Sequence, residues 1–284
     1  MNSNIKNILN KLKSKIYFDY DVGKLTWFRT GGNAKIYALV ESQDDLEIIF
    51  SNNIILIGNF KYSLWDNFDE LYIEPINIYP NQVRSDLKKY LNNFDSGIVL
   101  GRLELNAFKS YKNEHFLRFS AGIFEEMFGG VGFDYQYYPQ GSFISFGAET
   151  YFVKKRDYSL DFSFQKYKNT FSRVNVQAIE PRTKVKFKLS YGEYLAGDEG
   201  YTFAISRRFD NGVELGGFLT KTDVTYEQFG EGSFDKGIQI NIPFSLFGGN
   251  SLSRYEWRPL TKDPGALLIK SVDISDQISR YRVY

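Results

Sequence analysis

The sequence predicts a mainly β protein: an antiparallel up-and-down β-barrel of the outer-membrane type with about 12 strands, preceded by a small α+β N-terminal segment. Apolar and polar residues alternate in many short segments between Ile98 and Leu268. Successive side chains of a strand point to opposite faces, so each segment has one apolar and one polar face. The connections alternate between short and long, and aromatic residues, 18% of the chain, stand near many segment ends. Both features are typical of membrane barrels.

The clearest strand segment is Lys184–Tyr191, in which three lysines alternate with Val185, Phe187 and Leu189. A helix would place residues three and four apart on one face, whereas this pattern has a period of two. The same alternation recurs in segments 99–107, 117–123, 144–152, 173–178, 201–206, 213–220 and 238–242. We therefore expect a series of two-sided strands over residues 97–284.

The connections between these segments predict an up-and-down order. Short turns are expected at 110–113, 139–142, 181–182, 210–212 and 248–250, and longer connections at 125–130, 154–170, 192–200, 221–235 and 259–265. Asp210-Asn211-Gly212 suits a hairpin because Asn and Gly tolerate positive φ. Tight turns on one rim and loops on the other indicate an outer-membrane barrel.

The composition excludes several kinds of site. The chain has 35 Lys and Arg against 34 Asp and Glu, a formal net charge of +1, so no nucleic-acid partner is expected. It has no cysteine and one histidine, His115, which excludes disulfides, thiol catalysis and a histidine metal cluster. We predict no catalytic residue, no metal site and no bound cofactor.

The sequence divides into three parts: residues 1–50 form an α+β N-terminal fragment, 51–96 a transition segment and 97–284 the barrel. Residues 1–15 predict a short amphipathic helix, and no export signal is recognisable there. No run of about eighteen apolar residues occurs, so no transmembrane helix is expected. Barrels cross a membrane with segments of about ten alternating residues, so the lack of a long apolar run does not exclude a membrane barrel.

The stretch Thr26–Ala34 (TWFRTGGNA) resembles the opening of UDP-N-acetylenolpyruvoylglucosamine reductase (MurB), whose family leads from here into an FAD-binding domain. The likeness covers roughly residues 5–50. The family's Gly- and Ser-rich flavin loop is not recognisable in residues 52–65. We therefore expect a fragment that does not bind FAD, with Gly31-Gly32 as a tight turn.

Residues from about 54 to 284 resemble the C-terminal part of the YjbH family, Gram-negative outer-membrane proteins tied to exopolysaccharide production and export. Eight stretches between residue 66 and residue 268 carry the likeness. They are DNFDELYIEP (66–75), VRSDLKKYL (83–91), GIFEEMFGGVG (122–132), YFVKKRD (151–157), YGEYLAGDEG (191–200), SRRFDNGVELGGFLTKTDV (206–224), FGEGSFDKGIQINIPF (229–244) and WRPLTKDPGALL (257–268).

This resemblance implies a non-enzymatic barrel in the Gram-negative outer membrane. Its implied partners are outer-membrane lipid, polysaccharide and other secretion components. The reductase-like start ahead of this remainder leaves three explanations: a gene fusion, a misassembled gene or a wrongly placed start.

The candidate functional residues are charged side chains on the polar faces of the strands, which would line the lumen. They are Arg102, Glu104, Arg118, Glu149, Arg173, Lys184, Lys186, Lys188, Arg208 and Glu214. Mixed charge inside a small barrel favours a salt-bridge network over an open pore. The excess of basic residues in this set suggests a narrow or plugged conduit, or a docking platform, for anionic or neutral glycan.

Other charged residues predict less. Arg84 and Asp86 are expected to form a solvated pair, and Glu125-Glu126 to lie in a loop. Asp198-Glu199 and Asp223 are weak candidates for a divalent-cation site, because oxygen ligands this sparse rarely suffice.

Two other functions compete with the barrel. The reductase likeness suggests an FAD-dependent UDP-N-acetylmuramate dehydrogenase of peptidoglycan synthesis, and FAD would be its cofactor. A soluble secreted β-sandwich is the third option, since soluble sheets also alternate.

Overall fold

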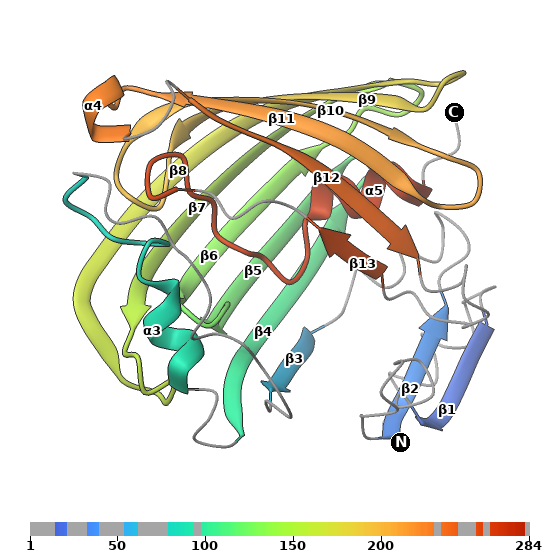
Figure 1. The fold of residues 1–284 in the computed structure, drawn as a ribbon. Coiled ribbons are helices and arrows are strands. Elements are labelled where there is room, and N and C mark those ends of the chain that lie inside the picture. The colour runs from blue at the N-terminus through green and yellow to red at the C-terminus, as the bar shows by residue number, and fades with distance from the viewer. Residues whose placement is uncertain are drawn as a thin grey trace.

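The computed structural model describes residues 15–21, 33–39, 54–61, 79–93, 98–229, 234–243, 254–257 and 262–281. One antiparallel sheet of 11 strands dominates it, and its strands lie side by side in chain order from β3 to β13. Figure 1 shows this sheet curving strongly around one side. The predicted mainly β, antiparallel, up-and-down architecture is confirmed.

The strands of this sheet are β3 (Ile54–Lys61), β4 (Val99–Tyr111), β5 (His115–Ile123), β6 (Phe128–Tyr137), β7 (Ile144–Arg156), β8 (Phe164–Glu180), β9 (Val185–Glu193), β10 (Glu199–Arg208), β11 (Glu214–Thr222), β12 (Asp235–Pro243) and β13 (Arg254–Trp257). A separate sheet pairs β1 (Lys15–Asp21) with β2 (Asn33–Leu39). The helices are α3 (Leu87–Leu91), α4 (Tyr226–Phe229) and α5 (Ile274–Tyr281).

The expected closure of about twelve strands is not seen in the described residues. Within them β3 pairs only with β4 and β13 only with β12, so the sheet has two edges. The α+β start is represented by β1 and β2. The helix expected over residues 1–15 and the turn at Gly31-Gly32 fall outside the described residues, apart from Lys15, at which β1 begins.

Several connections are shorter than the sequence suggested, including 192–200, where β9 runs to Glu193 and β10 begins at Glu199. The expected loop 125–130 ends where β6 begins at Phe128. Glycine at 130 is a strand residue: a Cβ there would lie 2.0 Å from the backbone oxygen of Phe152 on β7, so the glycine permits close strand approach. The expected loop 154–170 shrinks because β7 and β8 stay paired as far as Arg156 and Phe164.

We call this sheet inverted, because it exposes its apolar face and covers its polar face, the reverse of the arrangement in a soluble protein. We call the face that carries Phe146, Val176, Leu189 and Phe203 the outer face. These residues are partners in one row across β7–β10, and Phe146 is 51% exposed. The opposite, inner face carries a row of charges instead, and there Glu104 and Arg118 are 0% exposed. Alternation predicted two faces, and the structure shows that the polar one is covered.

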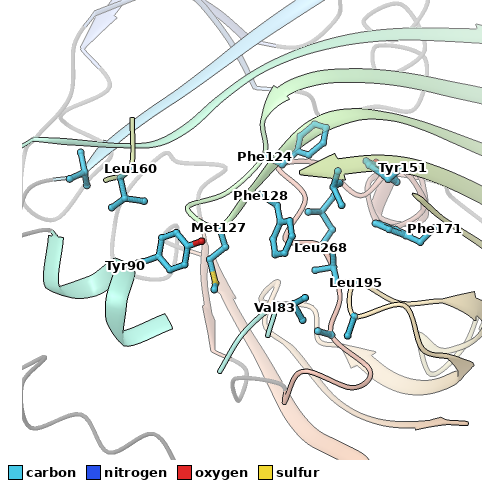
Figure 2. Packing of buried hydrophobic residues seen from close by; sticks show 14 residues of the cluster. Val83, Tyr90, Phe124, Met127, Phe128, Tyr151, Leu160, Phe171, Leu195 and Leu268 are labelled. Atoms are coloured by element: carbon cyan, nitrogen blue, oxygen red, sulfur yellow. The ribbon is translucent and has the colours of Figure 1, made fainter. Parts of the chain in front are cut away.

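The main hydrophobic core lies toward one end of the sheet, where connections pack against buried residues of the strands. We call it the rim core (Figure 2). Its members are Val83, Tyr90, Val99, Phe124, Met127, Phe128, Tyr151, Val153, Leu160, Phe171, Leu195, Ala196, Ala266 and Leu268. They come from the α3 region, the β5–β6, β7–β8 and β9–β10 connections, strands β4, β6, β7 and β8, and residues 266–268.

The second core holds the C-terminal helix against the inner face. Ile274 and Ile278 of α5 pack on Phe108, Phe116 and Tyr138 of β4, β5 and the β6–β7 connection. We call residues 262–281 the C-terminal segment. It joins the rim core to this second core, so it runs along the inner face between them. None of the helices in the described ranges has the length and apolar character needed to cross a membrane.

The rim core can be tested with two phenylalanines of opposite placement. Phe128 is fully buried there, so Phe128→Ala should lower the free energy of unfolding by about 3–5 kcal/mol. Phe119 lies on the outer face and is half exposed, so Phe119→Ala should change it by less than about 1 kcal/mol. Urea unfolding in detergent, followed by circular dichroism, measures both. Equal effects would contradict a core built at the rim.

Candidate functional site

A row of four charges crosses the inner face of the sheet. Arg118 on β5 is the register partner of Asp134 on β6, Asp134 of Glu149 on β7, and Glu149 of Arg173 on β8. Cross-strand partners stand about 4.5–5.5 Å apart, so each charge meets the next. We call this set the charge row.

Neighbouring residues complete the pairing of the row. Arg118 donates from Nη2 to Oε1 of Glu104 at 3.1 Å, and Arg102 donates from Nη1 to Oε2 of Glu104 at 2.8 Å. Arg118 Nε also lies 3.6 Å from Oδ2 of Asp134. A buried charge is costly unless it is paired, so Glu104 and Arg118 depend on each other.

Lys270 of the C-terminal segment connects the two acids in the middle of the row. Its ammonium group donates to Oδ1 of Asp134 at 2.6 Å and also to Glu149. Without Lys270, Asp134 and Glu149 would be adjacent like charges, which repel. The segment therefore adds a cation between two acids that each also have an arginine partner on a neighbouring strand.

Two further ion pairs attach the segment to β9. Asp273 lies 3.3 Å from Lys188, and Asp276 lies 2.8 Å from Lys186, which also meets Glu214 of β11 at 2.9 Å. Together with Lys270, these contacts place charged groups of the segment opposite β6, β7 and β9.

The ten residues predicted to line the interior fall into two groups. Arg102, Glu104, Arg118, Glu149, Arg173, Lys186, Lys188 and Glu214 take part in the inner-face ion pairs described above. Arg208 is half-buried at the end of β10, in register with Glu214. Lys184 stands apart: it precedes β9 in a turn, its side chain is 53% exposed, and it pairs with Asp210 at 2.5 Å.

Sequence reasoning missed the acids and the lysine that balance this set. Asp134 lies on β6, where Val131, Phe133 and Tyr135 alternate with polar residues, and this period of two was the available signal. Lys270, Asp273 and Asp276 lie in a stretch without strand periodicity, and no local pattern points to them. These three acids and one lysine reduce the basic excess of the predicted set, seven bases against three acids, from four charges to two.

A second ionic cluster lies beside the rim core, where the expectation of a solvated Arg84–Asp86 pair is wrong. Arg84 and Asp86 are 7% and 5% exposed. Arg84 makes a two-pronged contact with Glu125, at 2.9 and 3.0 Å, and Asp86 accepts from Lys155 at 2.5 Å. The partners are 41 and 69 residues away in the chain, so a local reading could not find them.

Asp263 fixes the C-terminal segment to the α3 region. Its Oδ1 accepts hydrogen bonds from the backbone N–H groups of Val83, Arg84 and Ser85 at 2.8, 2.6 and 2.9 Å. Arg84 Nη2 donates to the backbone oxygen of Leu267 at 2.6 Å. Stretches 83–91 and 257–268, both in the predicted family likeness, are thus held together.

The acidic residues suggested as a cation site do not gather. Asp198 accepts from the backbone N–H of Gly265 at 2.7 Å, and burial raises the pKa of its carboxyl. Asp223 accepts from the backbone N–H of Glu199 at 3.0 Å. Within the described part of the chain no group of three or more His, Cys, Asp and Glu side chains is placed to hold a metal ion.

A cavity of about 590 Å³ lies between the inner face of β8–β12 and residues 266–276 of the C-terminal segment. Ion-paired residues of both walls line it, among them Arg173, Lys186, Lys188 and Lys270. Its size is within the range of ligand pockets. It is the candidate binding site of the described residues.

Removing Lys270 tests the charge row. Lys270→Met leaves Asp134 and Glu149 facing each other, so it should destabilise the protein by about 3–5 kcal/mol and speed hydrogen exchange in residues 262–281. The matched control is Lys184→Met, whose pair with Asp210 is exposed. Hydrogen exchange with mass spectrometry measures both. If the two variants exchange alike, Lys270 does not hold the segment.

The anchoring of the segment should depend on pH at both extremes. Burial opposes ionisation of Asp273, but Lys188 and Lys270 outweigh it and hold the pKa of its carboxyl well below the ordinary value. Burial also opposes the charge of Lys270, but Asp134 and Glu149 outweigh it and raise the pKa of its ammonium group well above the ordinary value.

The signs give the window. A carboxyl group whose pKa is lowered in the folded state stabilises the fold fully above about pH 4, and this stability is lost as pH falls through its folded-state pKa. A lysine whose pKa is raised in the folded state stabilises the fold fully below about pH 10, and this stability is lost as pH rises through its folded-state pKa. Exchange in residues 262–281, corrected for intrinsic rates, should stay constant between these limits. A change near pH 6–8 would contradict the assigned pairs.

The stretches that meet at the rim core lie within the part of the chain that a known family model matches. The family model YjbH, described as "Exopolysaccharide biosynthesis protein YbjH", matches residues 8–279. The uncharacterized lipoprotein YjbH of Escherichia coli (strain K12) is 29% identical over 275 residues, 93% of this chain and 39% of that protein. The chain thus spans about two fifths of that relative.

Another similar protein is UDP-N-acetylenolpyruvoylglucosamine reductase of Pelagibacter ubique (strain HTCC1062), 28% identical over 144 residues, 45% of this chain and 48% of that protein. No solved structure matches the chain. A reductase-like fragment at residues 5–50, and the boundaries at 50 and 96, stay predictions. Since the family model covers nearly the whole sequence, the chain belongs to the YjbH family.

Proposed function

We propose that this chain is a non-enzymatic component of exopolysaccharide production or export that forms a β-barrel in the Gram-negative outer membrane. The observation that carries the proposal is the inverted sheet: Phe, Leu, Val and Ile side chains are exposed over the outer face from β4 to β12, while charges are buried inside. Soluble monomers rarely expose a continuous apolar patch of this extent.

Lipid is the solvent that suits such a face. Hydrocarbon requires apolar side chains outward and every backbone N–H and C=O paired, and an antiparallel sheet meets both demands except at its edges. In the proposal the edges β3 and β13 become paired in the membrane, because open edges are not tolerated in hydrocarbon. The name of the E. coli relative, a lipoprotein, supports a place in the envelope.

The chain itself occupies much of the interior of the proposed barrel. The rim core occupies one end, and the C-terminal segment with its ion pairs and α5 runs along the inner face. This supports a plugged barrel or a docking platform for glycan and other secretion components over an open water-filled pore. Outer-membrane lipid and polysaccharide are the proposed partners.

An arginine on the outer face tests the membrane assignment. Leu189 lies near the middle of β9, so Leu189→Arg should cost about 2–4 kcal/mol of folding free energy in lipid vesicles. Gln140→Arg, in the exposed β6–β7 turn, is the control and should fold as the unaltered chain does. Heat-modifiable migration and flotation with vesicles measure both. Flotation that survives Leu189→Arg undiminished, or an unaltered chain that stays soluble without lipid or detergent, sinks the proposal.

The reductase likeness supplies the competing function, an FAD-dependent UDP-N-acetylmuramate dehydrogenase. It predicts a yellow purified protein with flavin absorbance, whereas the barrel proposal predicts no flavin and detergent-dependent solubility.

A further inference from the structure

The cavity between β8–β12 and the C-terminal segment has a chemistry more specific than its mixed charges suggest. Every basic residue named on its wall has an acidic partner. Arg173 lies 3.5 Å from Glu149, and Lys188 lies 3.3 Å from Asp273. Lys186 and Lys270 each contact two acids. A ligand that carries charge would have to displace one of these partners.

The groups left to bind a ligand are neutral. Asn175 and Asn241 line the cavity, and the Oδ1 atom of each is buried and accepts no hydrogen bond from the described residues. Ser190 and Gln239 also line it. A buried acceptor without a donor is costly, so these oxygens favour a ligand that donates hydrogen bonds.

One part of the cavity wall is a glycine. Gly216 of β11, in register with Ser206 of β10, lines the cavity, so no side chain fills the space at that position. The volume of about 590 Å³ exceeds what a few water molecules need. An uncharged ligand with several hydroxyl groups fits this combination of size, acceptors and compensated charge.

We propose that this cavity binds a neutral, hydroxyl-rich oligosaccharide segment and discriminates against an acidic one. The inference rests on the proposed function for its polysaccharide partner and adds the place and the charge class. Asn175 and Asn241 accept hydrogen bonds from sugar hydroxyls. Asp273 and Asp276 cause the selectivity for neutral over acidic sugars, because they neutralise the lysines that would otherwise attract carboxylates.

The test uses the purified full chain in detergent and isothermal titration calorimetry. The probes are neutral hexasaccharides of glucose, mannose and xylose, and hexagalacturonate as the acidic probe of equal length. At least one neutral probe should bind at least tenfold more tightly than hexagalacturonate. Binding of none of the neutral probes, or equal or tighter binding of hexagalacturonate, overturns the proposal.

Two variants locate the site. Asn175→Leu with Asn241→Leu should weaken neutral binding at least tenfold. Asn241→Asp keeps the side-chain shape, so it covers the case in which the double variant does not fold, and it should change neutral binding at least threefold. Gln140→Leu, in the exposed β6–β7 turn, is the control and should bind normally. Unchanged binding in both site variants overturns the assignment.

A third variant tests the origin of the selectivity. Asp273→Asn leaves Lys188 without its partner acid, so hexagalacturonate binding should rise at least tenfold while neutral binding changes little. No rise contradicts the role of the acids. If the chain floats with vesicles but fails these tests, the cavity inference alone falls. If the chain does not associate with lipid, the proposed function is wrong, whatever the result of the sugar titrations.

Discussion

The structure depends on the pairing of charges that the sheet turns inward. Arg118 and Glu104 are fully buried, and such groups persist only when each charge meets an opposite one. The strands give each acid of the charge row an arginine partner, but Asp134 and Glu149 remain adjacent acids that repel each other. Lys270, 136 residues from Asp134 in the chain, binds both acids and offsets this repulsion. The C-terminal segment is therefore part of the sheet's electrostatics and not an appendage.

The inward-facing charges also explain where the two hydrophobic cores form. An inverted sheet cannot bury its own apolar face, so its hydrophobic cores have to form elsewhere. They form where connections and terminal segments meet the ends of the sheet: the rim core beside α3, and the smaller cluster under α5. Asp263 and Arg84 join the C-terminal segment to the α3 region beside the rim core. The inner face is consequently covered by the chain itself.

Much of the sheet could be predicted from period-two alternation, because strand geometry is local. Lys186 and Lys188 opposite Phe187 and Leu189 give the sidedness of β9 directly. Long-range pairing could not be predicted: nothing near Arg84 in the sequence indicates Glu125, and nothing near Lys270 indicates Glu149. The loop expected at 125–130 ends early, because Gly130 lies in β6 and permits close strand packing there.

The most direct measurement of the central claim is the solvent that each face of a strand meets. The chain has no cysteine, so single spin labels can be placed at Phe187→Cys, Lys188→Cys and Leu189→Cys without background. In lipid vesicles the account predicts that labels at 187 and 189 are accessible to lipid-soluble oxygen and shielded from a water-soluble nickel complex. The label at 188 should be shielded from oxygen. Equal access of the nickel complex to 187 and 189 would contradict a lipid-facing outer surface.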